Sequence, residues 1–247
     1  MMGVALVAGA LFVGSLVDGD GGAAPPKRAA IVDQLSETGP PPVFAERATN
    51  ILERAGYAVE YFPQQVATVE FYRYLQTRGY GVIIFRAHSS RLVGEWNGKP
   101  MGEALIWTSE PFDPGRYVEE RRQLRLTRVY AYEGTPWYFG IGAGFVRSSM
   151  RGDFNGTTII MMGCDGLNGD VTARAFLDRG ARAVISWDGD VGVGHTDAAT
   201  ERLLRKLFAE GLPVDQAVEG TNAELGPDPV FGAELRALYR GAVLARP

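Results

Sequence analysis

The sequence contains very few of the residues that bind metals or form disulfides. It has one cysteine, Cys164, and two histidines, His88 and His195, among 247 residues. A single cysteine cannot form an internal disulfide, and these three residues cannot supply the four ligands of a Cys/His zinc site. We therefore expect no metal and no cofactor, and we expect the lone thiol to serve chemistry.

The sequence also lacks an excess of positive charge. Lys and Arg number 25 against 29 Asp and Glu, a net charge of −4. This balance excludes a protein that binds nucleic acid through electrostatic attraction, so we expect no nucleic-acid partner. Hydrophobic residues make up 46% of the chain, enough for a sizeable core in one large domain or two small ones.

The first 17 residues carry no charge, and residues 18–26 are mainly Gly, Ala, Pro and Asp. An uncharged apolar run that falls short of the ~20 residues needed to span a bilayer is typical of a signal peptide or a short anchor. The sequence thus predicts a signal peptide or membrane anchor plus linker over 1–26, followed by one domain over 27–247. We expect an extracytoplasmic protein, secreted or attached to a membrane through its N-terminal segment.

From Lys27 onward, apolar runs of strand length alternate with helical patterns. This alternation predicts an α/β fold with a mostly parallel central sheet and helices on both faces. The expected strands cover 28–34, 57–62, 82–87, 157–163 and 182–187. The expected helices cover 42–55, 66–78, 170–179, 196–211 with Thr196 as the N-cap, and 213–225.

The segment 91–155 interrupts this alternation. It contains the turn signals Asn97-Gly98, Asp113-Pro-Gly115 and Glu133-Gly134 between short β-prone stretches. We expect an insertion of hairpins above the sheet.

Four predicted strands end in a polar residue: Asp33, His88, Cys164 and Asp188. Because ligands bind at the carboxyl edge of open α/β sheets, these four side chains mark a candidate site. A cysteine thiol is intrinsically nucleophilic, and a neighbouring imidazole suffices to activate it. The alternative stays open, because a single cysteine after an apolar run is often simply buried and a lone histidine is often structural.

Gly163 and Gly166 flank the cysteine, and we expect them to let a substrate backbone approach closely. The stretches 82–89, 159–166 and 180–186 read VIIFRAHS, IIMMGCDG and GARAVIS. The order of a strand ending in His, an inserted segment and a strand ending in Cys resembles the caspase-like cysteine peptidases, a group that includes metacaspases, clostripain and gingipains.

This resemblance implies a caspase-like three-layer sandwich and a peptide or protein substrate. It implies that His88 acts on the substrate amide and leaving group while Cys164 attacks the scissile carbonyl to form an acyl-enzyme. The backbone N–H groups of Ser89 and Cys164 would form the oxyanion hole.

Specificity for basic residues is a further hypothesis. Many relatives with that specificity have an acidic residue two positions before the cysteine, where Met162 stands here. We therefore assign substrate binding to Asp188 and Asp33, since a carboxylate favours Arg or Lys. Met162 and Ser89, which stands where relatives usually have glycine, also favour an alternative, a catalytically inactive binding or scaffold protein with this fold.

Overall fold

The computed structural model describes residues 27–37, 43–96 and 99–239. The prediction of a signal or anchor segment over 1–26 lies outside these residues. Within them, no helix is both long and apolar enough to cross a membrane.

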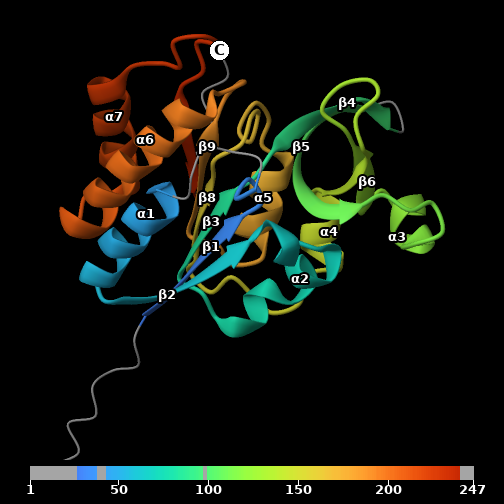
Figure 1. Cartoon of the computed structure of the whole chain (residues 1–247), viewed down its shortest axis with the longest axis horizontal. Helices are drawn as coiled ribbons and strands as arrows, with labels where there is room; N and C mark the ends of the chain where they lie inside the picture. The colour runs from blue at the N-terminus through green and yellow to red at the C-terminus, as the bar shows by residue number, and fades with distance from the viewer. Residues whose placement is uncertain (1–26, 38–42, 97–98, 240–247) are drawn as a thin grey trace, which may run out of the picture.

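A six-stranded sheet forms the centre of the fold, with the strand order β10-β9-β8-β3-β1-β2 (Figure 1). All neighbours in it are parallel except β10, which runs antiparallel to β9 at the edge. Its strands are β1 (Lys27–Asp33), β2 (Tyr57–Pro63), β3 (Val82–Arg86), β8 (Thr158–Met161), β9 (Ala183–Trp187) and β10 (Leu235–Tyr239).

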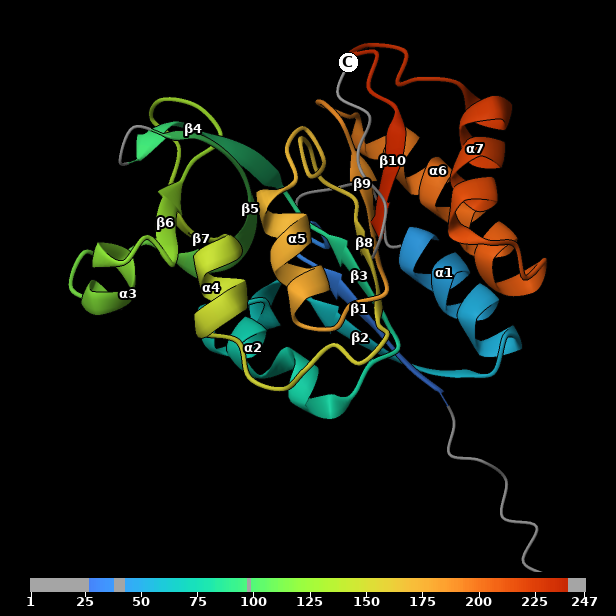
Figure 2. The ribbon, with the colours of Figure 1, turned by 180° about the vertical axis from the view of Figure 1, so that it is seen from behind.

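Helices cover both faces of this sheet, which confirms the fold class predicted from the sequence (Figures 1 and 2). One face carries α1 (Val43–Arg54), α6 (Val193–Leu204), the π-helical turn η3 (Arg205–Ala209) and α7 (Val214–Leu225). The other face carries α2 (Val69–Tyr74), the short turns η1 (Gln64–Val66) and η2 (Leu75–Arg78), α4 (Ala143–Ser148) and α5 (Val171–Asp178).

The central strands are buried on both sides, which explains their continuous apolar runs. In β3, Val82 and Ile84 belong to the core under α1 and α6, whereas Ile83 and Phe85 belong to the core under α2 and α5. This alternation follows from the two-residue period of a strand. Arg86 ends β3 and is also fully buried.

The inserted segment forms a second, antiparallel sheet with the order β4-β5-β7-β6. Its strands are β4 (Ser89–Trp96), β5 (Lys99–Pro111), β6 (Leu126–Val129) and β7 (Tyr138–Ile141). The short helix α3 (Val118–Arg122) lies between β5 and β6 in the sequence. In the ribbon this sheet curls beside the main sheet, and β4 begins three residues after β3 ends (Figure 1).

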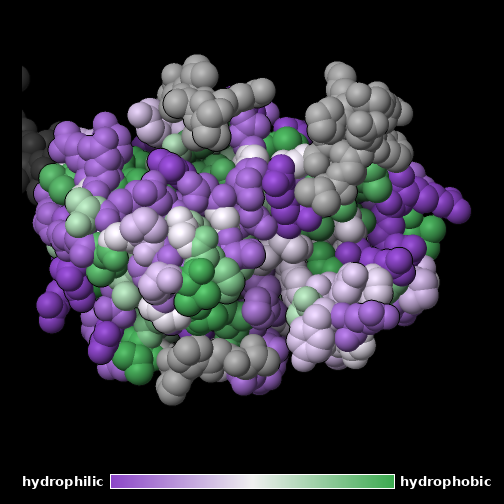
Figure 3. Space-filling model, turned by 90° about the horizontal axis from the view of Figure 1, so that it is seen from above, coloured by the Kyte–Doolittle hydropathy of each residue, from purple (hydrophilic) through white to green (hydrophobic). Residues whose placement is uncertain are grey.

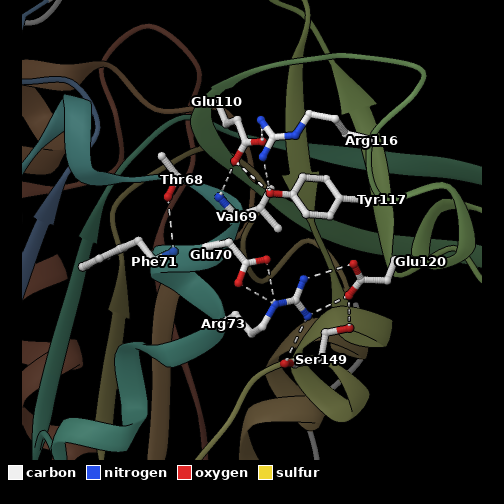
Figure 4. Close-up of polar contacts among 10 residues, drawn as sticks. All are labelled: Thr68, Val69, Glu70, Phe71, Arg73, Glu110, Arg116, Tyr117, Glu120 and Ser149. Carbon is white, nitrogen blue, oxygen red and sulfur yellow. Dashed lines mark hydrogen bonds and ion pairs between the residues drawn. The ribbon is translucent and has the colours of Figure 1, made fainter.

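Glu110 at the end of β5 ties the insertion to α2 (Figure 4). Its carboxylate accepts hydrogen bonds from the backbone N–H of Val69 at 3.0 Å and from the hydroxyl of Tyr117 at 3.4 Å, and it pairs with Arg116 at 2.6 Å. Glu110 is 6% exposed, so these contacts replace the water that a buried carboxylate loses.

A second tie centres on Arg73 in α2 (Figure 4). Its guanidinium binds Glu70 on the same helix and both carboxylate oxygens of Glu120 in α3, at 2.8 and 3.0 Å. The hydroxyl of Ser149 also donates to Glu120 at 2.6 Å. Paired carboxylates raise the pKa of Arg73, and the arrangement fixes α3 against the main body.

Two predicted helices differ from the structure. The helix expected over 66–78 is divided, because Thr68 caps α2 through its hydroxyl and the chain tightens into η2 from Leu75. The helix expected to begin after Thr196 begins at Val193 instead, with Gly192 at its N-cap. Thr196 as an N-cap was therefore wrong, and its hydroxyl has another role, described below.

Candidate functional site

The pairing of β3 with β8 brings His88 and Cys164 to the same level of the sheet edge. Phe85 and Met161 are direct partners in this parallel pair. His88 lies three residues beyond the first and Cys164 three residues beyond the second. The two chain segments therefore leave the sheet side by side at its carboxyl edge. Seen from that edge, the surface is mainly hydrophilic with smaller hydrophobic areas between (Figure 3).

Direct contacts hold these two segments together. The hydroxyl of Ser89 donates a short hydrogen bond to the carbonyl of Cys164. A Cβ placed on Gly163 would overlap the Ser89 hydroxyl and the Ala87 carbonyl, and would lie 2.8 Å from the Ser89 nitrogen. Only glycine permits this approach.

The two glycines beside the cysteine thus have a different role from the one expected. The space next to Gly163 is filled by the His88 segment, and the space next to Gly166 is filled by the hydroxyl of Ser186. Close approach occurs between parts of the same chain, so these glycines position Cys164 and leave no room there for a substrate backbone.

His88 is held through its backbone and through its ring. Its N–H donates to the side-chain oxygen of Gln34 at 3.0 Å, and its ring centroid lies 5.2 Å from that of Trp107 in β5. The indole N–H of Trp107 donates to Ser90 at 3.0 Å, which fixes the indole. The residue is exposed, but the packed side of the ring loses water, and this burial lowers the pKa of His88.

The Cys164 thiol is half-buried, with its sulfur 3.8 Å from the carbonyl of Val191. Burial raises the pKa of Cys164, and the carboxylates of Asp190 and Asp165 raise it further, whereas the contact with Val191 lowers it. With a lowered pKa at His88 and a raised pKa at Cys164, both the imidazole and the thiol are uncharged at rest at neutral pH.

Backbone donors are present beside the sulfur. Among the described residues, the N–H groups of Gly163 and Cys164 donate no hydrogen bond. The backbone nitrogen of Ser89 lies next to Gly163, since a Cβ placed on that glycine would be 2.8 Å from it. Ser89 does not require a positive φ, since the non-glycine residues with positive φ in the described ranges are Tyr117, Leu124, Asn155 and Asp165.

Asp33 lies below this edge and has no exposed surface. It accepts hydrogen bonds from Arg86 at 2.9 Å and from the hydroxyl of Tyr61 at 3.1 Å. Arg86 also binds both oxygens of Asp197 on α6 at 2.9 Å. Asp33 was predicted to contact substrate, but its burial prevents this. Its carboxylate instead holds Arg86, and the Arg86 side chain links β1, β3 and α6 beneath the site.

Asp188 is partly exposed but fully engaged. One oxygen accepts from the N–H of Glu234 at 2.8 Å, and the other pairs with Arg236 at 2.9 Å. These contacts attach β10 to the end of β9. A cationic side chain of a substrate would have to compete with Arg236 for this carboxylate.

Three residues that sequence reasoning did not select also shape the site. Thr196 donates to the carbonyl of Met162 and accepts from the indole N–H of Trp187, both at 2.9 Å, which anchors the turn before Cys164. Asp190 and Asp165 are the carboxylates that raise the pKa of the Cys164 thiol. The sequence places two acidic residues, Asp188 and Asp190, directly after a predicted strand. Only the folded loop shows that Asp190, and not Asp188, acts on the Cys164 thiol.

The described residues contain no group of three or more His, Cys, Asp or Glu side chains arranged to hold a metal ion. Neither a family model nor a curated protein matches the sequence. The fold is similar to a crystal structure of the Arg-specific cysteine proteinase gingipain R, with a TM-score of 0.42 and 11% sequence identity. The similarity covers 80% of this chain and 42% of that chain, so this chain matches less than half of the gingipain length.

Proposed function

We propose that this protein is a cysteine-type endopeptidase in which Cys164 is the nucleophile and His88 moves the proton. The observation that carries the proposal is the equal offset of the two residues beyond the paired strands β3 and β8. The hydrogen bond from Ser89 to the Cys164 carbonyl supports it, because it fixes the distance between the two segments.

The uncharged resting pair defines the sequence of proton transfers. His88 accepts the thiol proton as the Cys164 sulfur forms a bond to the scissile carbonyl carbon. The C–N bond then breaks, and the His88 imidazolium gives its proton to the leaving amine. Water, deprotonated by the same imidazole, attacks the thioester and releases the acid and the thiol.

The negative charge on the carbonyl oxygen requires hydrogen-bond donors during both attacks. We assign this role to the backbone N–H groups of Cys164 and Ser89. The N–H of Gly163 is a third donor at the same turn without a partner in the described chain.

Preference for a basic residue before the scissile bond is the finer part of the proposal. Asp190 is exposed and forms no ion pair within the described chain, unlike Asp188 with Arg236. A guanidinium or ammonium bound at Asp190 would also remove a charge that disfavours the Cys164 thiolate. Substrate binding would then assist the nucleophile.

A labelled peptide library with varied residues before the scissile bond tests both parts. The full-length protein should cleave Arg and Lys peptides, and Cys164→Ala and His88→Ala should each abolish cleavage. Asp190→Asn should lower kcat/KM for Arg peptides more than for Ala peptides, with Asp188→Asn as the matched comparison. Equal cleavage of Arg and Ala peptides would remove the basic preference and leave the peptidase proposal standing.

The raised pKa of Cys164 favours a second candidate, a binding or scaffold protein without turnover. An electrophilic peptide that labels active thiols separates the two. Labelling of Cys164 that depends on His88 supports the peptidase, whereas labelling no faster than that of a free thiol, with no cleavage of any library peptide, supports the scaffold.

A further inference from the structure

The edge of the main sheet opposite to His88 and Cys164 contains a hollow of about 290 Å³. Its lining includes Lys27 at the start of β1, Tyr57 at the start of β2 and Thr158 at the start of β8. Gly81 and Arg182, which directly precede β3 and β9, also line it. Since β9, β8, β3, β1 and β2 are successive neighbours, the hollow extends across the amino ends of five strands.

The charge of this hollow is positive, although the whole chain carries a net charge of −4. Lys27, Arg28 and Arg182 line it, and no acidic residue does. Arg28 is neutralised by Glu60 outside the lining. Within the described chain, neither Lys27 nor Arg182 forms an ion pair, so two positive charges remain uncompensated.

The polar side chains of the lining are also hydrogen-bond donors. The guanidinium of Arg182 donates to the hydroxyl of Thr158 at 3.1 Å, which orients its planar face. The Lys27 ammonium lies 5.7 Å from the centre of the Tyr57 ring. Burial raises the pKa of Tyr57 and Arg182 lowers it, with a net increase, so the phenol keeps its proton and remains a donor.

We propose that this hollow binds a phosphate group through Lys27, Arg182 and the hydroxyls of Tyr57 and Thr158. A guanidinium presents a planar set of donors that matches two phosphate oxygens, and an ammonium adds a compact charge for a third. A carboxylate has only two oxygens, so the set of donors around the hollow favours the larger oxyanion. The site lies across the sheet from the proposed dyad and does not depend on peptidase activity.

The phosphate has two sources, a soluble phosphate compound and a phospholipid headgroup. The second source is relevant because the uncharged segment 1–17 ends only ten residues before Lys27 in the sequence. A chain attached to a membrane through that segment would carry this hollow close to the lipid surface.

Calorimetric titration of the full-length protein with inorganic pyrophosphate is the first test. We expect saturable binding to one site, weakened at least tenfold in Lys27→Gln and in Arg182→Gln. Arg122→Gln is the matched control, since it removes a cation that is 74% exposed on α3 and should bind like the wild type. Arg182→Lys keeps the charge but loses the planar donors, and we expect an intermediate affinity.

Sedimentation with phosphatidylcholine vesicles, with and without phosphatidic acid, identifies the source. Binding that requires phosphatidic acid and is displaced by pyrophosphate assigns the site to headgroups, whereas pyrophosphate binding without vesicle binding assigns it to soluble phosphate. The proposal is overturned if neither ligand binds saturably, or if Lys27→Gln and Arg182→Gln bind as tightly as Arg122→Gln.

Discussion

Replacing Gly163 by alanine is the most direct test of how the candidate site is held together. The new Cβ would lie 2.8 Å from the Ser89 nitrogen, where ordinary contact begins at 3.4 Å, and closer still to the Ala87 carbonyl. Two of its three nearest neighbours are backbone atoms, so the strain cannot be relieved by turning a side chain. The His88 segment must move away from Cys164 by more than half an ångström.

Two effects of different size should follow. Overfilling a packed site costs about 1–3 kcal/mol of folding free energy. At about 2–4 °C per kcal/mol for a chain of this size, the melting temperature should fall by about 2–12 °C. The rate of peptide cleavage should fall about 100-fold, because a misplacement near 1 Å has effects of that order on reacting groups.

The assay measures both quantities on the same preparations, with melting followed by circular dichroism and cleavage at a temperature where all variants are folded. Gly194→Ala is the matched control. Gly194 lies in α6, a Cβ there has no neighbour within 4 Å, and alanine should stabilise the helix by about 0.5–1 kcal/mol. If Gly163→Ala keeps wild-type melting and wild-type cleavage, the close contact between the two segments does not position the dyad.

Three further predictions concern charged groups. Arg86→Met leaves the buried carboxylate of Asp33 without its cation, and chemical denaturation should show a loss of about 3–5 kcal/mol, which an unchanged midpoint would contradict. Arg73→Met removes charged hydrogen bonds that fix α3, and should cost about 1.5–3 kcal/mol and speed proteolysis within 112–125, whereas equal proteolysis would refute this role. Asp190→Asn removes a charge that raises the pKa of Cys164, so iodoacetamide should alkylate the thiol faster at pH 8, and a slower rate would reverse the assigned sign.

The pH dependence of cleavage should report the two uncharged groups of the dyad. Burial lowers the pKa of His88 below its usual 6.5, so the acid limb of kcat/KM should fall below that pH as the base becomes protonated. The pKa of Cys164 is raised above 9.0, so no second inflection from the thiol should occur between pH 7 and 9. A midpoint of the acid limb above 6.5 would contradict the neutral resting pair.

The central strands of the main sheet could be predicted from the sequence because they are short runs of apolar residues. The run from Val82 to Phe85 is apolar at every position because the strand is buried on both faces, and such a continuous apolar run is typical of a central parallel strand. β10 could not be predicted in the same way, because residues 235–239 form neither a continuous apolar run nor a strict alternation, and they pair only at the sheet edge. The start of α2 at Val69 involves Glu110, which accepts a hydrogen bond from the Val69 N–H although it lies 41 residues further along the chain.

The sequence indicated that the candidate residues lie at the carboxyl edge of the sheet, but it did not indicate the roles of the two acidic residues among them. The strand order fixed where Asp33 and Asp188 would lie, but not which partners their oxygens would find. An arginine at the end of the apolar run 82–86 was a usable signal, since a buried Arg86 requires a buried acid and Asp33 ends the neighbouring strand. For Asp188, the partner Arg236 comes from β10, the strand that the sequence did not reveal.

The two residues of the proposed dyad are 76 positions apart in the sequence, and most of the chain between them forms the second sheet. During synthesis the imidazole emerges first, and the nascent polypeptide has the proposed proton acceptor without the proposed nucleophile until β8 and Cys164 have left the ribosome. Until then the free side of β3 is an unpaired hydrophobic edge, which is a template for association with other chains. A message truncated within the insertion would therefore yield an inert product that tends to aggregate, and catalytic competence would arise only in a finished molecule.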